Sequence, residues 1–267
     1  MAIQWSVLAT RLDDPDAAPW LEQSSDLVLK TASVGKLLVL GEVARRLDNG
    51  ELAADHRVSR TGSRFVRDSG LWHVLDQEEL TVVDVCRLVG AVSDNLATNV
   101  LIDLVGLDAV AAYGDSLGAK PMEMLDYVSG EARDLSIPGT PPTLSRASAA
   151  SLVHYLRSLY DGTVSPRVAE WMSLSTDLSM VASAFGADPL AHNAIGESEE
   201  ARLINKTGTD DGIRADVGLV RDGDRAVGYA VIANWPTDES APGLASVMAR
   251  MRRIGDDIRD RLAQESS

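Results

Sequence analysis

Three short strings, far apart in the chain and in a fixed order, constrain its fold more than any other feature. They are Ser33–Lys36 (Ser-Val-Gly-Lys), Ser93–Asn95 (Ser-Asp-Asn) and Lys206–Gly208 (Lys-Thr-Gly). An S-x-x-K string arises about once by chance in a chain of this size, whereas the ordered trio should arise in roughly one chain in a thousand or fewer. We therefore expect a fold that brings these three distant segments to one small crevice.

Composition is compatible with such a fold and narrows the class of protein. The chain has 267 residues, enough for one large domain or for two subdomains that share a core. Its hydrophobic content of 45% and charged content of 24% are those of an ordinary globular protein. No apolar run approaches about 18 residues, and residues 1–14 lack the basic and apolar regions of a secretory signal. We expect no membrane association and, at face value, a cytoplasmic location, or export if a leader has been trimmed.

Charge and rare residues exclude several function classes. The net charge of −15 argues against a nucleic acid partner, because phosphate backbones require clustered Lys and Arg. A single cysteine, Cys86, excludes an internal disulfide and a cysteine-rich metal site. The four histidines lack metal-ligand spacing, and neither a G-x-S-x-G elbow nor a nucleotide-binding string occurs. We therefore predict no metal and no cofactor.

Hydrophobic periodicity places strands at both ends of the chain and helices between them. The simplest packing is an α/β (α+β) fold, in which an antiparallel sheet built from both chain ends is flanked by helices, with an all-helical subdomain inserted. We predict a single domain over 1–267, with a discontinuous sheet subdomain of 1–30 and 190–267 and a helical subdomain of 31–189. Strands are predicted over 3–10, 26–30, 202–206, 215–220 and 227–233, and helices over 31–47, 82–92, 96–105, 108–117, 145–160, 166–174 and 241–263.

Residues 119–143 interrupt this pattern. They have no convincing period and contain four prolines. Unstructured connections longer than about 12–15 residues are uncommon in compact domains and are often functional. We therefore expect a functional loop here.

Ser33 and Lys36 have the pattern of a serine nucleophile with an amine base. Ser33 opens a predicted helix and Lys36 follows at i+3, so both side chains leave the same face. A serine hydroxyl needs a base, and a lysine is one only where burial or nearby cations lower its pKa. The Ser33 N–H at the helix start would supply one half of an oxyanion hole. Taken alone, the string could also be a capping serine with a solvated lysine.

The second string, Ser93–Asn95, falls in a turn between two predicted helices. There the Ser93 hydroxyl can point into a cleft and relay a proton to a leaving nitrogen, while the Asn95 amide holds a substrate amide. The alternative is a helix N-cap, which Ser93 and Asp94 suit equally well.

The third string, Lys206–Gly208, comes at the end of a predicted strand. Gly208 would let a substrate lie against the strand edge, and the Thr209 N–H would complete the oxyanion hole. Lys206 can lower the cost of deprotonating Ser93, and the hydroxyls of Thr207 and Thr209 can bind a substrate carboxylate. Arg214, a few residues on, adds positive charge. An ordinary strand-end lysine followed by a turn glycine is the alternative for this string alone.

Together the motifs resemble those of class A serine β-lactamases and of the related penicillin-binding proteins and D,D-peptidases. The Ser33-to-Ser93 interval is similar to the class A interval, and residues 73–106 and 204–234 resemble the family's second-motif region and last strands. The resemblance covers most of the chain and implies the same two-subdomain fold. It assigns the roles given above to Ser33, Lys36, Ser93, Asn95, Lys206 and Thr207.

One departure concerns the loop after the second motif. Class A enzymes carry there a glutamate, with a nearby asparagine, that activates the deacylating water. Counting from Leu125-Asp126, that place holds Ser129; Glu131 comes two residues later, and no asparagine follows it. Either Glu131 reaches the site through a reshaped loop or the base is missing, and we favour a missing base. The family's leading helix and export signal are also absent from residues 1–14.

These features predict a serine acyl-transfer hydrolase that opens a β-lactam amide through an acyl-enzyme on Ser33. The alternatives are a D-alanyl peptidase or esterase of the same family, and a penicillin-binding protein that acylates without turnover. The expected partner is a small molecule, either a β-lactam or a D-alanyl-like substrate. The sequence does not fix the oligomeric state.

Overall fold

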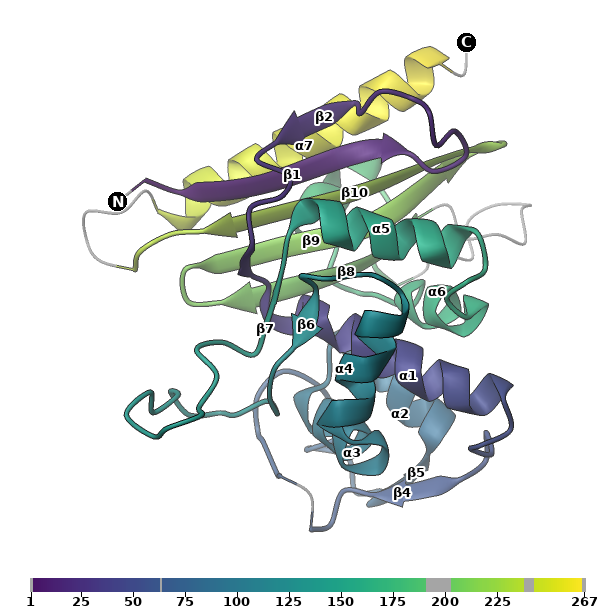
Figure 1. Ribbon diagram of the computed structural model, residues 1–267, viewed down its shortest axis with the longest axis vertical. Helices are drawn as coiled ribbons and strands as arrows, with labels where there is room; N and C mark the ends of the chain where they lie inside the picture. Colours follow the sequence, from purple (N-terminus) through teal and green to yellow (C-terminus); the bar gives the residue numbers. More distant parts are fainter. Residues whose placement is uncertain (1, 63, 191–202, 238–242, 266–267) are drawn as a thin grey trace.

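A five-stranded antiparallel sheet forms the centre of the computed structural model, which describes residues 2–62, 64–190, 203–237 and 243–265. Its strand order β2-β1-β10-β9-β8 joins the two ends of the chain, as Figure 1 shows, because β1 pairs with β10 from Gln4↔Asn234 to Arg11↔Val227. The predicted antiparallel sheet is therefore present. The strands are β1 (Gln4–Arg11), β2 (Leu21–Gln23), β8 (Leu203–Asp210), β9 (Ile213–Asp222) and β10 (Arg225–Asn234).

Helices cover both faces of this sheet. On one face α7 packs with η2 over the odd-numbered side chains of β1 and β10, such as Val7 and Val231. On the other face α5 packs against β1 and β10, and the remaining helices continue the larger hydrophobic core beyond it (Figure 1). The helices are α1 (Lys36–Asp48), α2 (Val82–Val92), α3 (Asn95–Val105), α4 (Leu107–Ser116), α5 (Ala149–Tyr160), α6 (Pro166–Met172) and α7 (Leu244–Glu265), with the 3-10 turns η1 (Ala32–Gly35) and η2 (Val181–Phe185).

The front part of the sheet differs from the prediction. Residues 26–30 contribute only β3 (Leu29–Lys30), which pairs with β7 (Ser145–Ala147) in a separate three-stranded sheet with β6 (Glu123–Met124). The second N-terminal strand of the main sheet is β2, whose three residues are too few to show a period of two. A further pair, β4 (Arg57–Ser59) and β5 (Glu79–Thr81), was also not predicted.

Two predicted boundaries were wrong for local reasons. The helix predicted over 145–160 begins only at Ala149, because Ser148 caps it through reciprocal bonds with Ser151 while residues 145–147 form β7. The strand predicted to end at Lys206 continues to Asp210, so the third string lies inside β8 rather than at its end. The Asp-Gly turns predicted after it are present, since Gly212 and Gly223 both have positive φ.

The predicted subdomain boundaries at 30/31 and 189/190 stay a prediction. The packing of α5 places part of the segment 31–189 directly against the main sheet. Residues 191–202, which follow the second boundary, lie outside the described residues. In the described part of the chain, no single helix has the length and apolar character needed to cross a membrane; α3 and α4 meet those criteria only as a pair bent by 84°, and both contribute side chains to the core.

Candidate active site

Ser33 is held at the surface of the core by a strained turn. Ala32 has φ +47°, a left-handed conformation that costs a non-glycine residue about 1–3 kcal/mol. Ser145 of β7 holds this turn, because its hydroxyl donates to the Ala32 carbonyl oxygen at 2.5 Å and is hydrogen-bonded to the Thr31 hydroxyl at 2.7 Å. The turn leads directly into η1 and α1, as predicted, and leaves Ser33 half-buried.

Gly208 brings the third string against this turn. A Cβ built on Gly208 would lie 2.0 Å from the Thr31 carbonyl oxygen and 3.3 Å from the Ser33 nitrogen. No side chain fits there, so the backbones of β8 and η1 touch only because residue 208 is a glycine. We expected Gly208 to make room for a substrate. Among the described residues, the group that leaves no room for a side chain at this position is the backbone of Thr31 and Ser33.

The second string forms the left-handed turn between α2 and α3. Ser93 has φ +55°, and Asp94 rather than Ser93 caps α3 by accepting from Ala97 N at 2.8 Å. The other Asp94 carboxylate oxygen accepts from the N–H groups of Leu71 and Trp72 at 2.7 and 2.8 Å. With the capping done by Asp94, the Ser93 hydroxyl is free to face the cleft.

Two buried lysines converge on Ser93. Lys36 Nζ donates to the Ser93 carbonyl oxygen at 2.6 Å, to the Ser93 hydroxyl at 3.2 Å and to Asn95 Oδ1 at 2.6 Å. Lys206 Nζ donates to the same hydroxyl at 2.9 Å and to the Thr207 carbonyl oxygen at 2.9 Å. Within the described ranges neither lysine forms an ion pair with a carboxylate. Lysines of the first and third strings therefore meet at the hydroxyl of the second, where the sequence analysis expected the three strings to share one crevice.

Burial lowers the pKa of both amines. Removal from water lowers the pKa of Lys36 well below its usual value, and the neighbouring charge of Lys206 lowers it further. Burial also lowers the pKa of Lys206 to about 8, against the opposing attraction of Asp177 and Asp216. Lys36 is thus suited to be a neutral base and Lys206 to stay cationic at neutral pH.

Ser33 lies where two lobes of a cleft meet. The Glu131 lobe, of about 530 Å³, is bordered by the loop that carries Glu131, and the Asp177 lobe, of about 300 Å³, lies beside Asp177 and Lys206. Both lobes are lined by Ser33, Asn95, Asp68 and Thr209. No hydrogen bond joins Ser33 Oγ to another described residue, and the described hydrogen bonds of Lys36 go to Ser93 and Asn95.

The remaining predicted binding residues lie on the edge strand β8 and the hairpin that follows it. Thr207 and Thr209 both line the Asp177 lobe, but the Thr207 hydroxyl donates to Asp177 Oδ2 at 2.7 Å. Arg214, opposite Thr209 on β9, donates from Nη1 to the carbonyl oxygens of Asp210 and Ile213 at 2.9 and 2.7 Å. Its guanidinium therefore braces the β8–β9 turn.

The loop expected to carry a deacylation base is exposed. Glu131 borders the same lobe as Ser33, but the described residues offer its carboxylate no hydrogen bond, and only its N–H donates, to Ser129 Oγ at 3.0 Å. Asn99 of α3 holds the start of the loop, exchanging hydrogen bonds of 2.9 Å with the N–H and carbonyl groups of Val128. Arg133 pairs with Asp126 across the loop.

Sequence reasoning missed three residues of the site. Asp68 accepts from Asn95 Nδ2 at 3.0 Å and lines both lobes. Nothing in its sequence context identifies it as a site residue. Asn99 sits four residues after Asn95, so helical periodicity places both on one face of α3. Asp177 is followed by Ser179, which donates to it in an Asx turn, a local pattern that the sequence does show.

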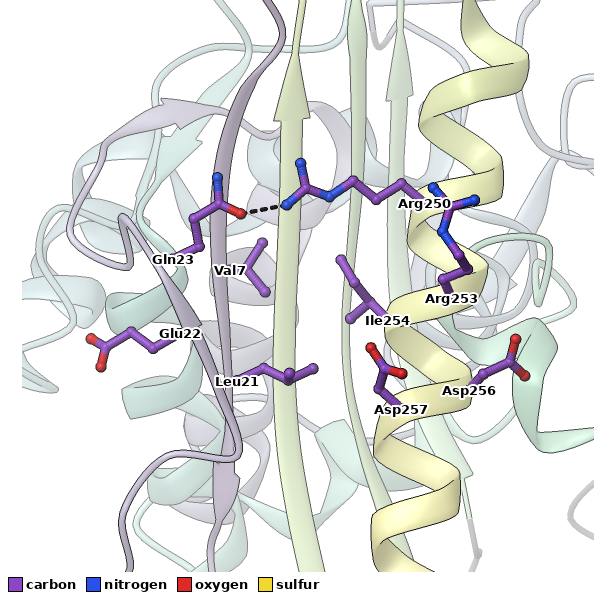
Figure 2. A pocket seen from close by; sticks show the side chains of 9 residues that line it. All are labelled: Val7, Leu21, Glu22, Gln23, Arg250, Arg253, Ile254, Asp256 and Asp257. Atoms are coloured by element: carbon purple, nitrogen blue, oxygen red, sulfur yellow. Dashed lines mark hydrogen bonds between the residues drawn. The ribbon is translucent and has the colours of Figure 1, made fainter.

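A separate cavity of about 400 Å³ lies between β2 and α7, on the opposite face of the sheet. Figure 2 shows Arg250 reaching across it to Gln23, whose Oε1 accepts a hydrogen bond from the guanidinium. No serine, cysteine, histidine or lysine is among the residues that line it. In the described ranges no group of three or more His, Cys, Asp or Glu side chains could hold a metal ion. The cleft at Ser33 is therefore the candidate active site.

Comparisons with known proteins agree with this fold. A beta-lactamase from Rhodobacter capsulatus is 28% identical over 159 residues, which are 57% of this chain and 53% of that protein, so the match spans about half of that relative. The structure of a beta-lactamase from Sphaerobacter thermophilus superposes with a TM-score of 0.79 at 23% identity, covering 98% of this chain and 92% of that one. An acyl-enzyme complex of a PBP-A variant with penicillin G gives 0.74 at 17% identity, covering 98% and 91%.

These structural similarities show a fold of the β-lactamase and transpeptidase type, as the sequence predicted. The sequence profile described as "Beta-lactamase enzyme family" matches residues 2–262, a range that includes all three strings. The chain belongs to the beta-lactamase enzyme family.

Proposed function

We propose that this chain is a serine acyl-transfer hydrolase that opens a β-lactam amide through an acyl-enzyme on Ser33. Membership of the beta-lactamase family supports hydrolase activity. The observation that carries the mechanism is the Ser93 hydroxyl, which lies within hydrogen-bond distance of Lys36 at 3.2 Å and of Lys206 at 2.9 Å, beside a cleft lined by Ser33. An alcohol held between two desolvated amines can pass a proton across the reacting bond.

In the attack, neutral Lys36 takes the Ser33 proton. A neutral amine has two N–H donors and one lone pair, and two close acceptors, the Ser93 carbonyl and Asn95 Oδ1, already stand at 2.6 Å. Its lone pair is thus left for a hydroxyl proton. Ser33 Oγ bonds to the carbonyl carbon, and the electron pair of the C=O bond moves onto oxygen, where the N–H groups of Ser33 and Thr209 stabilise it.

In the collapse, the carbon–nitrogen bond breaks and the nitrogen needs a proton. Ser93 supplies that proton and is reprotonated by the Lys36 ammonium, so the proton taken from Ser33 ends on the leaving nitrogen. Lys206 remains charged throughout and lowers the cost of the transient negative charge on Ser93. Asn95 and the free edge of β8 position the substrate amide.

Water then resolves the ester on Ser33 in a hydrolase. A specific observation favours a second candidate, a penicillin-binding protein that acylates and stalls. The Glu131 carboxylate makes no hydrogen bond to a described residue, and none of the residues that Lys36 contacts is acidic. The one carboxylate bonded to this cluster among the described residues, Asp68, accepts from Asn95 Nδ2, which supports a cluster built for the attack and without a base held on the acyl-enzyme.

A chromogenic cephalosporin separates the candidates when colour and protein mass are followed together. Continuous colour release at catalytic protein concentration, lost in Ser33→Ala, supports the hydrolase. A single stoichiometric burst with a persistent adduct on Ser33 supports the stalled acyl-enzyme instead. If the protein neither releases colour nor gains mass, both β-lactam proposals are wrong.

A further inference from the structure

The Asp177 lobe contains an arrangement that the attack mechanism does not use. The Thr207 hydroxyl, which the sequence assigned to a substrate carboxylate, donates its only proton to Asp177 Oδ2 at 2.7 Å. The other Asp177 oxygen accepts from the N–H and the hydroxyl of Ser179 at 3.2 and 2.7 Å. Both oxygens of this half-buried carboxylate are thus held in place at the cleft wall.

Two carboxylates and one ammonium are among the described side chains that line the Asp177 lobe. Asp68 lines the same lobe, and Lys206 is the one cation among its described lining residues. The Lys206 ammonium already donates to Ser93 and to the Thr207 carbonyl oxygen. Arg214 interacts with the charge of Asp177, but it is not among the described residues that line the lobe, and its Nη1 donates to two carbonyl oxygens of the hairpin.

A substrate carboxylate at Thr207 would therefore meet a fixed negative charge and a hydroxyl that can only accept. Repulsion between two carboxylates in the same cleft weakens binding, even where solvent near a protein surface partly screens the charges. A substrate group that donates a hydrogen bond, or that carries a positive charge, meets no such obstacle, because both the Thr207 oxygen and the lobe's carboxylates accept.

We propose that Asp177 is a specificity-determining residue that selects acyl substrates with an uncharged or cationic group beside the scissile bond and disfavours those with a carboxylate there. This inference rests on the proposed acyl transfer to Ser33. It adds a substrate class: esters, amides or β-lactams whose carboxylate is masked or replaced by an amine.

A cephalosporin and its methyl ester, which differ only in that carboxylate, test the proposal. We expect wild type to acylate the ester at least as fast as the acid, measured as the second-order rate of adduct formation by mass spectrometry. Asp177→Asn should raise the acid-to-ester ratio of rates at least tenfold, because it removes the charge and the amide can donate to the Thr207 oxygen. Asp177→Ser removes the charge with a smaller side chain and should move the ratio in the same direction.

Asp210→Asn is the matched control, since Asp210 lines the Glu131 lobe and, among the residues that the structure describes, its carboxylate accepts from the N–H of Asp211 alone. It removes the same unit of charge from the cleft and should change the ratio less than threefold. If both Asp177 variants leave the ratio within threefold of wild type, or lower it, the proposed selectivity is wrong.

A binding experiment distinguishes failure of the proposed selectivity from failure of the acyl-transfer proposal. With Ser33→Ala as background, the affinities of the acid and the ester are compared by titration calorimetry with and without Asp177→Asn. A tenfold rise in the acid-to-ester affinity ratio supports the selectivity even if no protein ever forms an adduct. An unchanged ratio overturns it, whatever the mass spectra show.

Discussion

The two sides of the cleft differ in how firmly their polar groups are held. Around Ser93, two buried lysines, an asparagine amide and backbone carbonyls form a dense set of hydrogen bonds between 2.6 and 3.2 Å. Across the cleft, Glu131 stands exposed on a loop, and its carboxylate bonds to no described residue. The groups proposed to form the acyl-enzyme are thus pre-organised, whereas those that would hydrolyse it are not.

The sharpest way to break this comparison is Lys36→Ala. The substitution removes the proposed base and leaves the buried Asn95 Oδ1 without its donor. We expect the rate of adduct formation on Ser33 to fall about a thousandfold. Mass spectrometry of the trapped protein measures it, with circular dichroism to show that the variant is folded. An adduct that forms at an undiminished rate would remove Lys36 from the mechanism.

Two glycines test the same contrast through stability. Gly208→Ala would force a Cβ to 2.0 Å from the Thr31 carbonyl oxygen, so we expect the free energy of unfolding to drop by about 1–3 kcal/mol. Gly130→Ala, in the exposed loop, would meet only Val66 at 3.5 Å and should change it by less than about 0.5 kcal/mol. Urea titration measures both. Equal losses would mean that the two sides are packed alike.

Alkaline pH should weaken the attack through Lys206. Its pKa of about 8 lies below that of an ordinary lysine, so it loses its proton as pH rises through 8, while it is charged at lower pH. We expect the acylation rate to fall about tenfold per pH unit above this pKa, which gives the pH–rate profile an alkaline limb. In Lys206→Arg the guanidinium stays protonated, and the alkaline limb should move upward. A limb that stays at the same pH in this variant would assign it to another group.

The smallest effect is expected from Glu131→Gln. Because the carboxylate forms no hydrogen bond with a described residue, the acylation rate and the rate of adduct loss should both stay within about twofold of wild type. Both are read from the same time course of protein mass. A selective, strong slowing of adduct loss would show that Glu131 reaches the acyl-enzyme, contrary to our sequence interpretation, and would make the two sides of the cleft equivalent.

Much of the fold and part of the candidate site could be predicted from the sequence, because short-range patterns specify them. Alternation and Asp-Gly turns predicted β8, β9 and β10, and the three strings predicted which segments would come together. The sequence could not decide whether Ser93 or Asp94 caps α3, since either residue type can cap a helix. The structure decides it, because Asp94 also accepts from Leu71 and Trp72, which are distant in sequence.

Other features depend on tertiary contacts that no local pattern encodes. Residues 26–30 look like a full strand, but only two of them find a partner, in β7. Gly208 was predicted to let a substrate lie against the backbone, but the contact that requires a glycine, with the backbone of Thr31, becomes visible only when β8 lies on η1. The bond from Thr207 to Asp177 likewise joins residues 30 positions apart through the packing of the sheet.

The pairing of β1 with β10 means that the main sheet cannot be completed until the last third of the chain has been made. Gln4 and its partner Asn234 are 230 positions apart, and a ribosome adding about 5–20 residues per second needs roughly 10–50 s to span them. During that time Ser33 and Lys36 have emerged, but Lys206 has not yet arrived or docked. The proposed nucleophile would therefore lack the second amine of its site until the segment that carries Lys206 has been made and has docked.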